Sequence, residues 1–405
     1  MNNNKLFQPL ELKNGIVLKN RFVKPAMSEV MGDKDYRPKE EIIDLYRNWA
    51  KGGTGLLITG NVMIDSNALG EKGNIVIEDE KNLDILKRWA KAGQINNSQI
   101  WVQLNHPGRQ SPKHLSKQPV GPSAVSLEGA NAFAFNKPRA LTVNEIQEII
   151  QRFANSAKIV KKAGFNGVEI HAAHGYLLSQ FLSPIANRRT DQYGGSLENR
   201  MRIIVEVYQE MRKAVGKKFP IALKINSSDF RSGGFSEEDS IEVIRKMSKL
   251  GVDLIEISGG NYENTMVQGS NKEGAFFTKY ASKVKNSIET PIIVTGGFRT
   301  LIGMEEAVLN HETDMIGLAR AMALISDLPN QAEKGIFKEI NIEKLSTGIT
   351  ILDKKIGSYI GLSYYEMQMK KIAKNKVIKR TQNAWIPLWF ALKTQGITML
   401  LPRRA

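Results

Sequence analysis

The stretch Gly167-Val168-Glu169-Ile170-His171-Ala172-Ala173-His174-Gly175-Tyr176 begins as a short apolar strand and ends in two histidines and a tyrosine. Because side chains alternate between the faces of a strand, Val168 and Ile170 share one face, and the alternate positions, which end in His171, share the other. The imidazole rings can donate N–H hydrogen bonds, and the phenol can donate a proton. The stretch therefore predicts a packed strand with candidate catalytic groups at its carboxyl end.

Similar short runs of β-branched or apolar residues recur along the chain, and segments with helical periodicity lie between them. This alternation is typical of a parallel α/β sheet. Eight strands are predicted, at residues 22–26, 55–60, 100–104, 167–171, 221–225, 254–258, 292–295 and 315–318. Seven helices are predicted, at residues 39–51, 81–96, 144–163, 197–215, 237–250, 279–287 and 301–309. We therefore predict a single (β/α)8 TIM barrel, and we disfavour an open doubly wound sheet because no Gly-x-Gly-x-x-Gly follows the first strand.

The predicted barrel accounts for residues 1–330, and residues 331–405 are predicted to form a carboxy-terminal appendage rather than a separate domain. Within the barrel, the segment 105–141 is rich in Pro, Gly and Ser and lacks periodicity. We expect it to form an elaborated loop over the active face. The irregular segment 259–278 is expected to cover the same mouth.

The appendage carries much of the chain's charge imbalance. The formal net charge is +16, and residues 331–405 hold 14 Lys and Arg against 5 Asp and Glu. Residues 364–373 are predicted to be helical, residues 385–390 form an aromatic cluster, and residues 336–352 have no distinctive pattern. No nucleic-acid-binding motif is present, so no nucleic acid is predicted as a partner. The appendage is expected to pack on the barrel, on a partner subunit of a homo-oligomer, or on a membrane surface.

The composition excludes several classes of chemistry. The 405 residues include no cysteine, so disulfides, thiolate zinc sites, iron–sulfur clusters and a cysteine nucleophile are excluded. The amino-terminal residues lack the apolar stretch of a signal peptide, and no run approaches the roughly 20 apolar residues of a membrane span. We therefore expect a cytoplasmic protein.

Barrel enzymes place their active sites at the carboxyl ends of the strands, and here those ends hold many hydrogen-bond donors and glycines. Glu169 and Asp229 are the acids expected nearby, which supports paired-carboxylate hydrolysis and divalent-metal binding only weakly. A metal-dependent barrel hydrolase using His171 and His174 stays open as an alternative, although no third ligand is evident and no metal is predicted. A non-catalytic barrel with a basic binding tail is a second alternative.

Two neighbouring strand ends predict a phosphate site. The stretch Thr295-Gly296-Gly297-Phe298-Arg299 follows the seventh strand, and Gly317-Leu318-Ala319-Arg320 ends the eighth, where TIM barrels usually bind phosphate. Glycines let backbone N–H groups approach an anion, and an arginine adds charge-assisted hydrogen bonds. Together the two ends favour phosphate binding over a pair of tight turns.

The residues around the first stretch resemble a known family. Residues 171–184 (HAAHGYLLSQFLSP) and 187–200 (NRRTDQYGGSLENR) resemble the hallmark of the old yellow enzyme family of flavin-dependent ene-reductases. Supporting matches are residues 20–27 (NRFVKPAM), 103–110 (QLNHPGRQ) and the turn 295–299. The similarity extends over residues 5 to 330 in family order.

The resemblance implies non-covalent FMN across the barrel mouth, reduced by NADH or NADPH. Reduced flavin then passes a hydride from N5 to the β-carbon of an activated alkene. Gln103 would bond the pyrimidine edge, and Lys224 would place positive charge near N1 and C2=O. The full set of implied cofactor-binding residues is Pro25, Ala26, Met27, Ser28, Gly60, Gln103, Lys224, Gly296, Gly297, Ala319 and Arg320.

The resemblance also implies roles for the three rings. His171 and His174 would donate hydrogen bonds to the substrate oxygen, on which negative charge grows as hydride arrives. Tyr176 would protonate the α-carbon, because a phenol with a reference pKa of about 10 stays protonated at neutral pH. The segment 188–200 is interpreted as scaffold, with Ser196 capping a helix.

Three positions depart from the family pattern. Ser28 stands where many members have threonine or cysteine, so thiol-based tuning of the flavin is absent. Lys224 replaces the common arginine, which gives a point charge in place of a planar fork. Ala319 replaces the usual glycine before Arg320, which is harmless unless the backbone needs a positive φ.

Overall fold

The computed structural model of the chain describes residues 4–129, 132–259 and 277–396. Eight of the described strands form a parallel barrel, in which each strand pairs with the next along the chain and the last pairs with the first. They are β3 (Phe22–Lys24), β4 (Leu56–Ile58), β6 (Gln99–Asn105), β9 (Gly167–Ala172), β10 (Ile221–Asn226), β11 (Leu254–Ser258), β12 (Ile292–Thr295) and β13 (Met315–Gly317). The predicted (β/α)8 barrel is confirmed, with every predicted strand in place.

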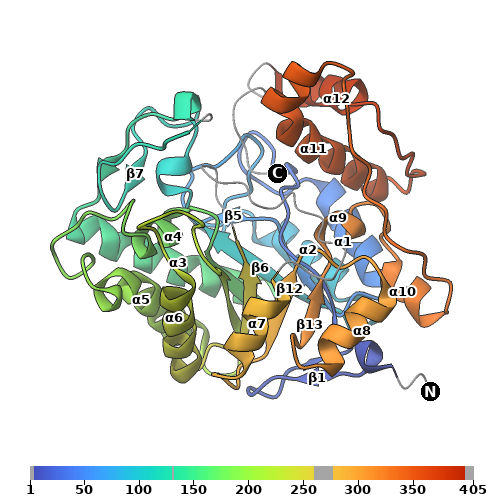
Figure 1. Cartoon of the computed structure of the whole chain (residues 1–405), viewed down its shortest axis with the longest axis horizontal. Coiled ribbons are helices and arrows are strands. Elements are labelled where there is room, and N and C mark those ends of the chain that lie inside the picture. The colour runs from blue at the N-terminus through green and yellow to red at the C-terminus, as the bar shows by residue number, and fades with distance from the viewer. Residues whose placement is uncertain (1–3, 130–131, 260–276, 397–405) are drawn as a thin grey trace.

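The helices predicted between the strands are also present, with ends that differ by at most three residues. They are α1 (Glu40–Lys51), α2 (Leu83–Gly93), α3 (Val143–Lys162), α5 (Leu197–Val215), α6 (Glu237–Leu250), α7 (Thr278–Lys285) and α8 (Leu301–Leu309). Figure 1 shows them around the outside of the barrel. Shorter elements that were not predicted are β1 (Leu10–Glu11), β2 (Val17–Leu18), β5 (Val62–Met63), β7 (Val120–Gly121), β8 (Arg139–Ala140), α4 (Leu177–Leu182), α9 (Ala319–Met322) and α10 (Leu328–Glu333).

Local signals explain where the principal helices begin. Thr142 and Glu145 form a capping box at the start of α3, in which each side chain accepts a hydrogen bond from the other's backbone N–H. Ser196 caps α5 as expected, because its hydroxyl accepts from the backbone N–H of Asn199. Ser236 caps α6 in the same way. These caps satisfy N–H groups that have no partner within the helix.

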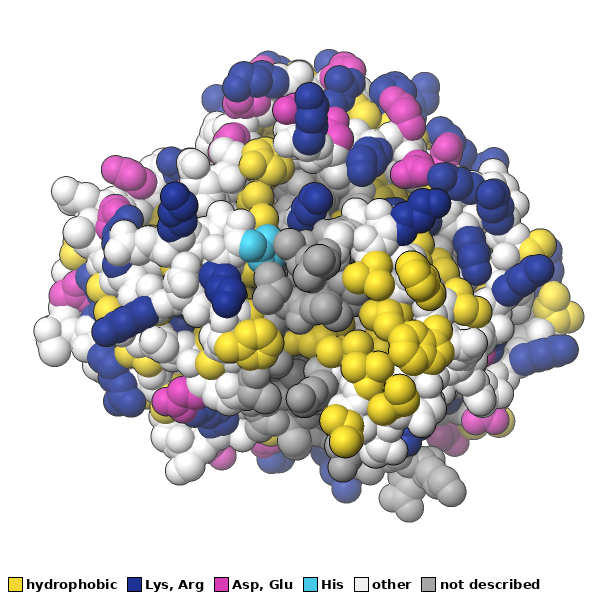
Figure 2. All heavy atoms as spheres, turned by 90° about the horizontal axis from the view of Figure 1, so that it is seen from above, with side chains coloured by type: hydrophobic (Ala, Val, Ile, Leu, Met, Phe, Trp, Pro, Cys, Tyr) yellow, Lys and Arg dark blue, Asp and Glu magenta, His cyan; other side chains and the backbone are white. Residues whose placement is uncertain are grey.

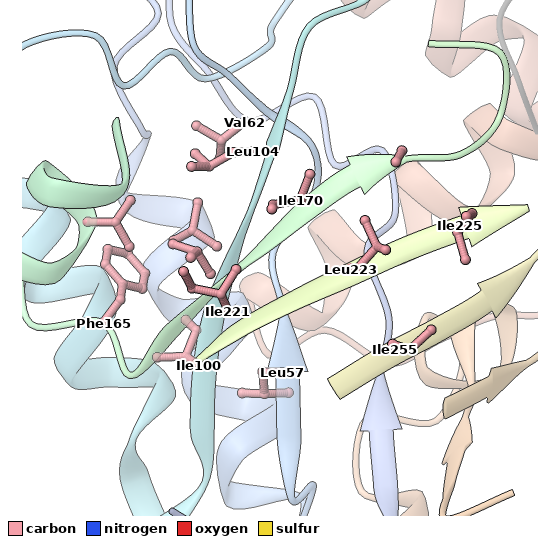
Figure 3. Close-up of a cluster of buried hydrophobic side chains, with 14 of the residues drawn as sticks. Leu57, Val62, Ile100, Leu104, Phe165, Ile170, Ile221, Leu223, Ile225 and Ile255 are labelled. Carbon is pink, nitrogen blue, oxygen red and sulfur yellow. The ribbon is translucent and has the colours of Figure 1, made fainter. Parts of the chain in front are cut away.

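Strand alternation divides the core in two. The outward side chains, including Leu57, Ile100, Ile170, Leu223 and Ile255, pack beneath the helices (Figure 3). The inward side chains near the amino ends of the strands form a second apolar cluster, which the β1–β2 hairpin closes. Figure 1 shows β1 at that end of the barrel. The functional groups are therefore left for the opposite end.

The appendage contains two helices, α11 (Thr350–Ala373) and α12 (Trp385–Gln395), at the end of the barrel opposite β1 (Figure 1). The helix predicted at 364–373 is the second half of α11, and the aromatic cluster at 385–390 is the first half of α12. Helix α11 packs against α1 of the barrel, where Asn48 Nδ2 donates to the Ile372 carbonyl over 2.7 Å and Lys374 lies 2.8 Å from Glu41.

The structure describes most of the irregular segment 105–141 but little of the irregular segment 259–278. The segment 105–141 contains the small β7–β8 sheet and lies at the same end of the barrel as α11 (Figure 1). Most of the segment 259–278 lies outside the described residues, so its expected place over the mouth stays a prediction. Among the described helices, none is long and apolar enough to cross a membrane.

His106, which directly follows β6, is predicted to make stability depend on pH. Burial lowers its pKa to about 4, whereas an unfolded histidine has a pKa of about 6.5. Between these values the unfolded chain binds the proton and the folded chain does not. The free energy of unfolding should therefore fall as the pH decreases from about 6.5 to 4, by up to roughly 3 kcal/mol.

Urea unfolding of the wild type and of His106→Asn across this pH range measures the effect. Asparagine keeps an acceptor for the Gly108 N–H, which donates to His106 Nδ1 over 3.0 Å. The variant should have a smaller pH slope between about 6.5 and 4. An unchanged slope would contradict the assignment.

Candidate active site

A layer of buried polar side chains lies above the apolar cluster inside the barrel. Gln103 and Glu169 are register partners on β6 and β9, and Gln103 Nε2 donates to Glu169 Oε1 over 2.7 Å. Lys224 and Glu256 are register partners on β10 and β11, and their Nζ and Oε1 atoms are 2.6 Å apart. Thr295 on β12 also donates to Glu256, over 2.8 Å. The polar layer therefore takes its side chains from five consecutive strands of the barrel.

The polar layer contains one lysine and two glutamates, and all three side chains are buried. Burial raises the pKa of Glu169 well above its usual range, and the negative charge of Glu256 raises it further. Both causes favour the protonated form of Glu169, whereas Lys224 Nζ and Glu256 Oε1 form an ion pair. Within the described residues, Oε2 of each glutamate is buried without a hydrogen-bond partner. The two Oε2 atoms are therefore the polar positions of the layer that the described residues leave unbonded.

The three rings of the first stretch cluster at the carboxyl end of β9. The His171 ring lies 5.0 Å from the His174 ring and 4.9 Å from the Tyr176 ring, each in an edge-to-face arrangement. His174 Nε2 is 2.7 Å from the Ser258 hydroxyl at the end of β11. Sequence reasoning predicted this grouping, and the structure shows the three side chains packed against one another.

The backbone turn at His174 is strained. His174 has φ 68° and Gly175 has φ 72°, and a left-handed conformation is uncommon for a residue other than glycine. Hydrogen bonds from three directions hold the turn. Asn226 accepts from the His174 N–H over 3.1 Å, Gln110 donates to the His174 carbonyl over 3.0 Å, and Gln180 donates to the Gly175 carbonyl over 2.8 Å. The turn therefore fixes the backbone from which the His174 side chain reaches the His171 ring.

The end of β3 and the end of β4 meet at Gly60. A Cβ atom at Gly60 would lie 2.4 Å from the Met27 carbonyl oxygen and 3.0 Å from Glu29 Oε2. This position therefore requires glycine. The neighbouring Ser28 donates to Glu71 over 2.5 Å and lies 3.4 Å from Glu366 Oε1. Glu366 belongs to α11, so the appendage reaches the barrel mouth.

The ends of β12 and β13 bring two arginines together. Gly296 and Gly297 have φ values of 107° and 94°, which favour glycine. Burial lowers the pKa of Arg299, and the charge of Arg320 lowers it further. Within the described residues, no ion pair joins either guanidinium to a carboxylate. Two neighbouring positive charges without a counter-charge are typical of an anion site. Ala319 does not have a positive φ, so alanine fits this position.

Several residues at the mouth were not predicted from the sequence. Glu256 was assigned to a core strand, although its alternation with Leu254 and Ser258 places it inside the barrel. Arg299 was quoted only as part of a turn. Glu366 lies in a segment with no recognised motif, so no local signal could have identified it. Asp229, considered as a nearby acid, instead anchors a loop through the Ser183 hydroxyl and the Phe235 N–H.

The residues present fit FMN and offer little to a metal. Gly60 lets the end of β4 pack against the backbone after β3, and the positive φ values at Gly296 and Gly297 leave backbone N–H groups that can approach an anion. Lys224 on β10 adds a buried positive charge inside the same barrel. In the described part of the chain, no group of three His, Asp or Glu side chains could hold a metal ion. The hydrolase alternative therefore still lacks a third ligand.

Comparisons with known proteins agree with this geometry. A family profile described as the NADH:flavin oxidoreductase / NADH oxidase family matches residues 5–339. The NADH-dependent flavin oxidoreductase iliE of Neonectria sp. (strain DH2) is 37% identical over 353 residues, which is 80% of this chain and 46% of that protein.

Two solved structures have similar folds. A complex of 2-naphthoyl-CoA reductase with 2-naphthoyl-CoA has a TM-score of 0.80 at 25% identity, and covers 95% of this chain and 58% of that one. Morphinone reductase in complex with tetrahydroNAD has a TM-score of 0.72 at 25% identity, and covers 84% of this chain and 93% of that one. The chain thus spans about half the length of the iliE and 2-naphthoyl-CoA reductase chains.

Gly60→Ala is predicted to damage the mouth. The added methyl group would overlap the Met27 backbone carbonyl, and overpacking of this kind costs about 1–3 kcal/mol. We also expect Gly60→Ala to retain less FMN than the wild type. Gly361→Ala in α11 is the matched control, because its Cβ would meet nothing within 4 Å and alanine stabilises a helix by about 0.5–1 kcal/mol relative to glycine.

Urea unfolding and FMN retention after ultrafiltration measure both variants. Equal stability and equal retention in Gly60→Ala and the wild type would show that the close approach at Gly60 is unimportant.

Proposed function

The chain belongs to the NADH:flavin oxidoreductase / NADH oxidase family, and on that premise we propose that it reduces the activated C=C bond of α,β-unsaturated carbonyl or related compounds. NADH or NADPH would supply the electrons through FMN. The observation that carries the proposal is the packing at the end of β9, where the ring centroids of His174 and Tyr176 lie 5.0 Å and 4.9 Å from that of His171. Two donors and one acid are what hydride addition to an enone requires.

The cofactor would lie across the mouth and contact residues from most of the strands. FMN would accept two electrons from the nicotinamide and deliver a hydride to the alkene. Met27, Ser28 and Gly60 would line the ring system, together with Pro25 and Ala26. Gln103 and Lys224 would face its pyrimidine edge. Gly296, Gly297, Ala319 and Arg320 would hold the phosphate, and we add Arg299 to that group because it shares the anion site.

Lys224 would act differently from an isolated positive charge. Its ion pair with Glu256 compensates most of its charge, so the electrostatic field at the pyrimidine edge depends on both side chains. Thr295 fixes Glu256 from the opposite side. Glu256 is therefore proposed as a positioning residue that sets how strongly Lys224 stabilises reduced flavin.

The histidines would hold the substrate oxygen. The Ala173 N–H donates to His171 Nδ1 over 3.3 Å, so in the neutral ring the proton lies on Nε2 and can be donated. The Ser258 hydroxyl beside His174 Nε2 fixes the orientation of the second ring. Both rings would stabilise negative charge on the oxygen more in the transition state than in the ground state.

Tyr176 would donate its phenolic proton to the α-carbon. The side chain is buried against His171, and its position at the amino end of α4 is set by the turn at His174. The catalytic assignment is therefore His171 and His174 for the oxygen and Tyr176 for the proton.

The first test is spectroscopic. The purified protein supplied with FMN should show a flavin band that bleaches with NADPH or NADH and returns when cyclohexenone is added under exclusion of oxygen. The three functions under consideration differ here, because neither a hydrolase nor a non-catalytic barrel would reoxidise flavin with an enone. A protein that binds FMN but is reoxidised only by oxygen would contradict the proposed reaction.

Tyr176→Phe is predicted to separate the two halves of the reaction. Reduction of the flavin by nicotinamide should be nearly unchanged, because it needs no proton from this side chain. Reoxidation by the enone should slow by about 10²-fold or more, the usual contribution of a positioned acid. Stopped-flow absorbance measures the two steps separately.

Tyr208→Phe is the matched control, because Tyr208 is buried between α5 and α6 and donates to the Leu250 carbonyl far from the mouth. It should cost about 1 kcal/mol of stability and leave both half-reactions unchanged. Equal slowing of both half-reactions in Tyr176→Phe would overturn the proton-donor role.

A further inference from the structure

The outer face of α12 is unusually apolar for an exposed helix. Leu388 and Ala391 on its inner face are buried against Ile360 of α11. On its outer face, Trp385, Ile386 and Trp389 are 40%, 47% and 70% exposed. A helix that is apolar on all sides is normally covered on all sides. Exposed large side chains of this kind, when they gather in one patch, mark an interaction site.

Two more exposed isoleucines extend this face at the start of α11. Ile349 and Ile351 are 51% and 70% exposed. The hydrogen bond from Trp385 Nε1 to the Thr347 carbonyl, 2.9 Å long, holds the starts of α11 and α12 together. Figure 2 shows an apolar patch over α12, with Lys and Arg side chains along its outer border. We name the residues Ile349, Ile351, Trp385, Ile386 and Trp389 the α12 patch.

Most of the charge around the α12 patch is positive, and Asp353, whose backbone N–H donates to the Ile349 carbonyl over 3.0 Å, is the acid beside its α11 part. From residue 367 to the end, the sequence contains nine Lys and Arg and no Asp or Glu. Lys393 follows Trp389 by four residues and therefore lies on the same helix face. The Lys370 ammonium lies 5.0 Å from the Phe390 ring on α12. Aromatic residues bordered by lysines suit the headgroup region of an anionic bilayer, where the rings enter the interface and the ammonium groups meet phosphates.

The same charge argues against a second copy of this chain as the occupant. A symmetric contact through the α12 patch would place the two basic segments next to each other, and like charges brought together oppose association. An anionic surface gains from the same charges. With 11 residues, α12 is too short to span a bilayer, which needs roughly 20, so any such contact is peripheral.

We propose that the α12 patch docks this protein on anionic lipid surfaces. The patch lies at the end of the barrel opposite β1, where the strands present their carboxyl ends (Figure 1). Docking would therefore hold the barrel mouth near the lipid. An apolar alkene dissolved in the membrane would then have a short path to the mouth, a consequence that rests on the proposed function. The docking proposal does not rest on the proposed function, because lipid binding is measured without substrate.

Vesicle sedimentation tests the proposal with the full chain. The wild type should sediment with vesicles of equimolar phosphatidylcholine and phosphatidylglycerol, less with phosphatidylcholine alone, and less as salt is raised. The double variant Ile386→Ser, Trp389→Ser should lower the partition coefficient by about tenfold for each side chain. The matched control is Ile302→Ser, Leu309→Ser on α8, where both side chains are also exposed and binding should be unchanged.

Two further measurements keep the proposal falsifiable if the double variant folds poorly. Lys393→Glu changes an exposed side chain, and it should weaken binding to anionic vesicles several-fold while leaving the urea midpoint unchanged. Sedimentation equilibrium without lipid reports self-association. Equal binding to both lipid compositions, or equal binding by the wild type and the double variant, would overturn the proposal. So would self-association that the double variant abolishes, because the occupant would then be a second copy.

Discussion

Closure of the barrel forces every second side chain of each strand into a space that water does not fill. The amino ends of the strands place apolar side chains there, and the next level places Gln103, Glu169, Lys224, Glu256 and Thr295. A buried ion pair contributes little to stability by itself, because desolvation offsets the Coulomb attraction. The polar layer therefore indicates a function at the carboxyl end of the strands, where the three rings and the two arginines also lie.

The site depends on neighbours that hold strained or charged groups in place. The left-handed backbone at His174 persists because Asn226, Gln110 and other side chains bind the turn from several directions. Glu256 pairs with Lys224 inside the barrel, and burial raises the pKa of Glu169 well above its usual range. Each of these arrangements would be unfavourable alone. They coexist because the closed sheet fixes the positions from which the supporting groups come.

The appendage is part of the same architecture. Helix α11 packs against α1 and brings Glu366 within 3.4 Å of Ser28. Burial raises the pKa of Tyr365 on α11, and the nearby positive charges of Arg320 and Arg299 oppose this shift. One side of the appendage therefore contacts the mouth, and the other exposes the α12 patch. A surface bound to the α12 patch would therefore be connected to the candidate active site through α11 and α12.

The sequence by itself determined the barrel, its eight strands and the grouping at His171, because these depend on local periodicity and on one contiguous motif. It did not identify Glu256 as the partner of Lys224, since that pairing depends on the register between two strands. It missed the first half of α11 because the apolar residues there follow no amphipathic period and because Gly357 and Gly361 lower the helix propensity. The contact between Ser28 and Glu366 joins residues 338 positions apart. Only tertiary packing decided it, because local patterns encode which face a residue takes and not which distant residue it meets.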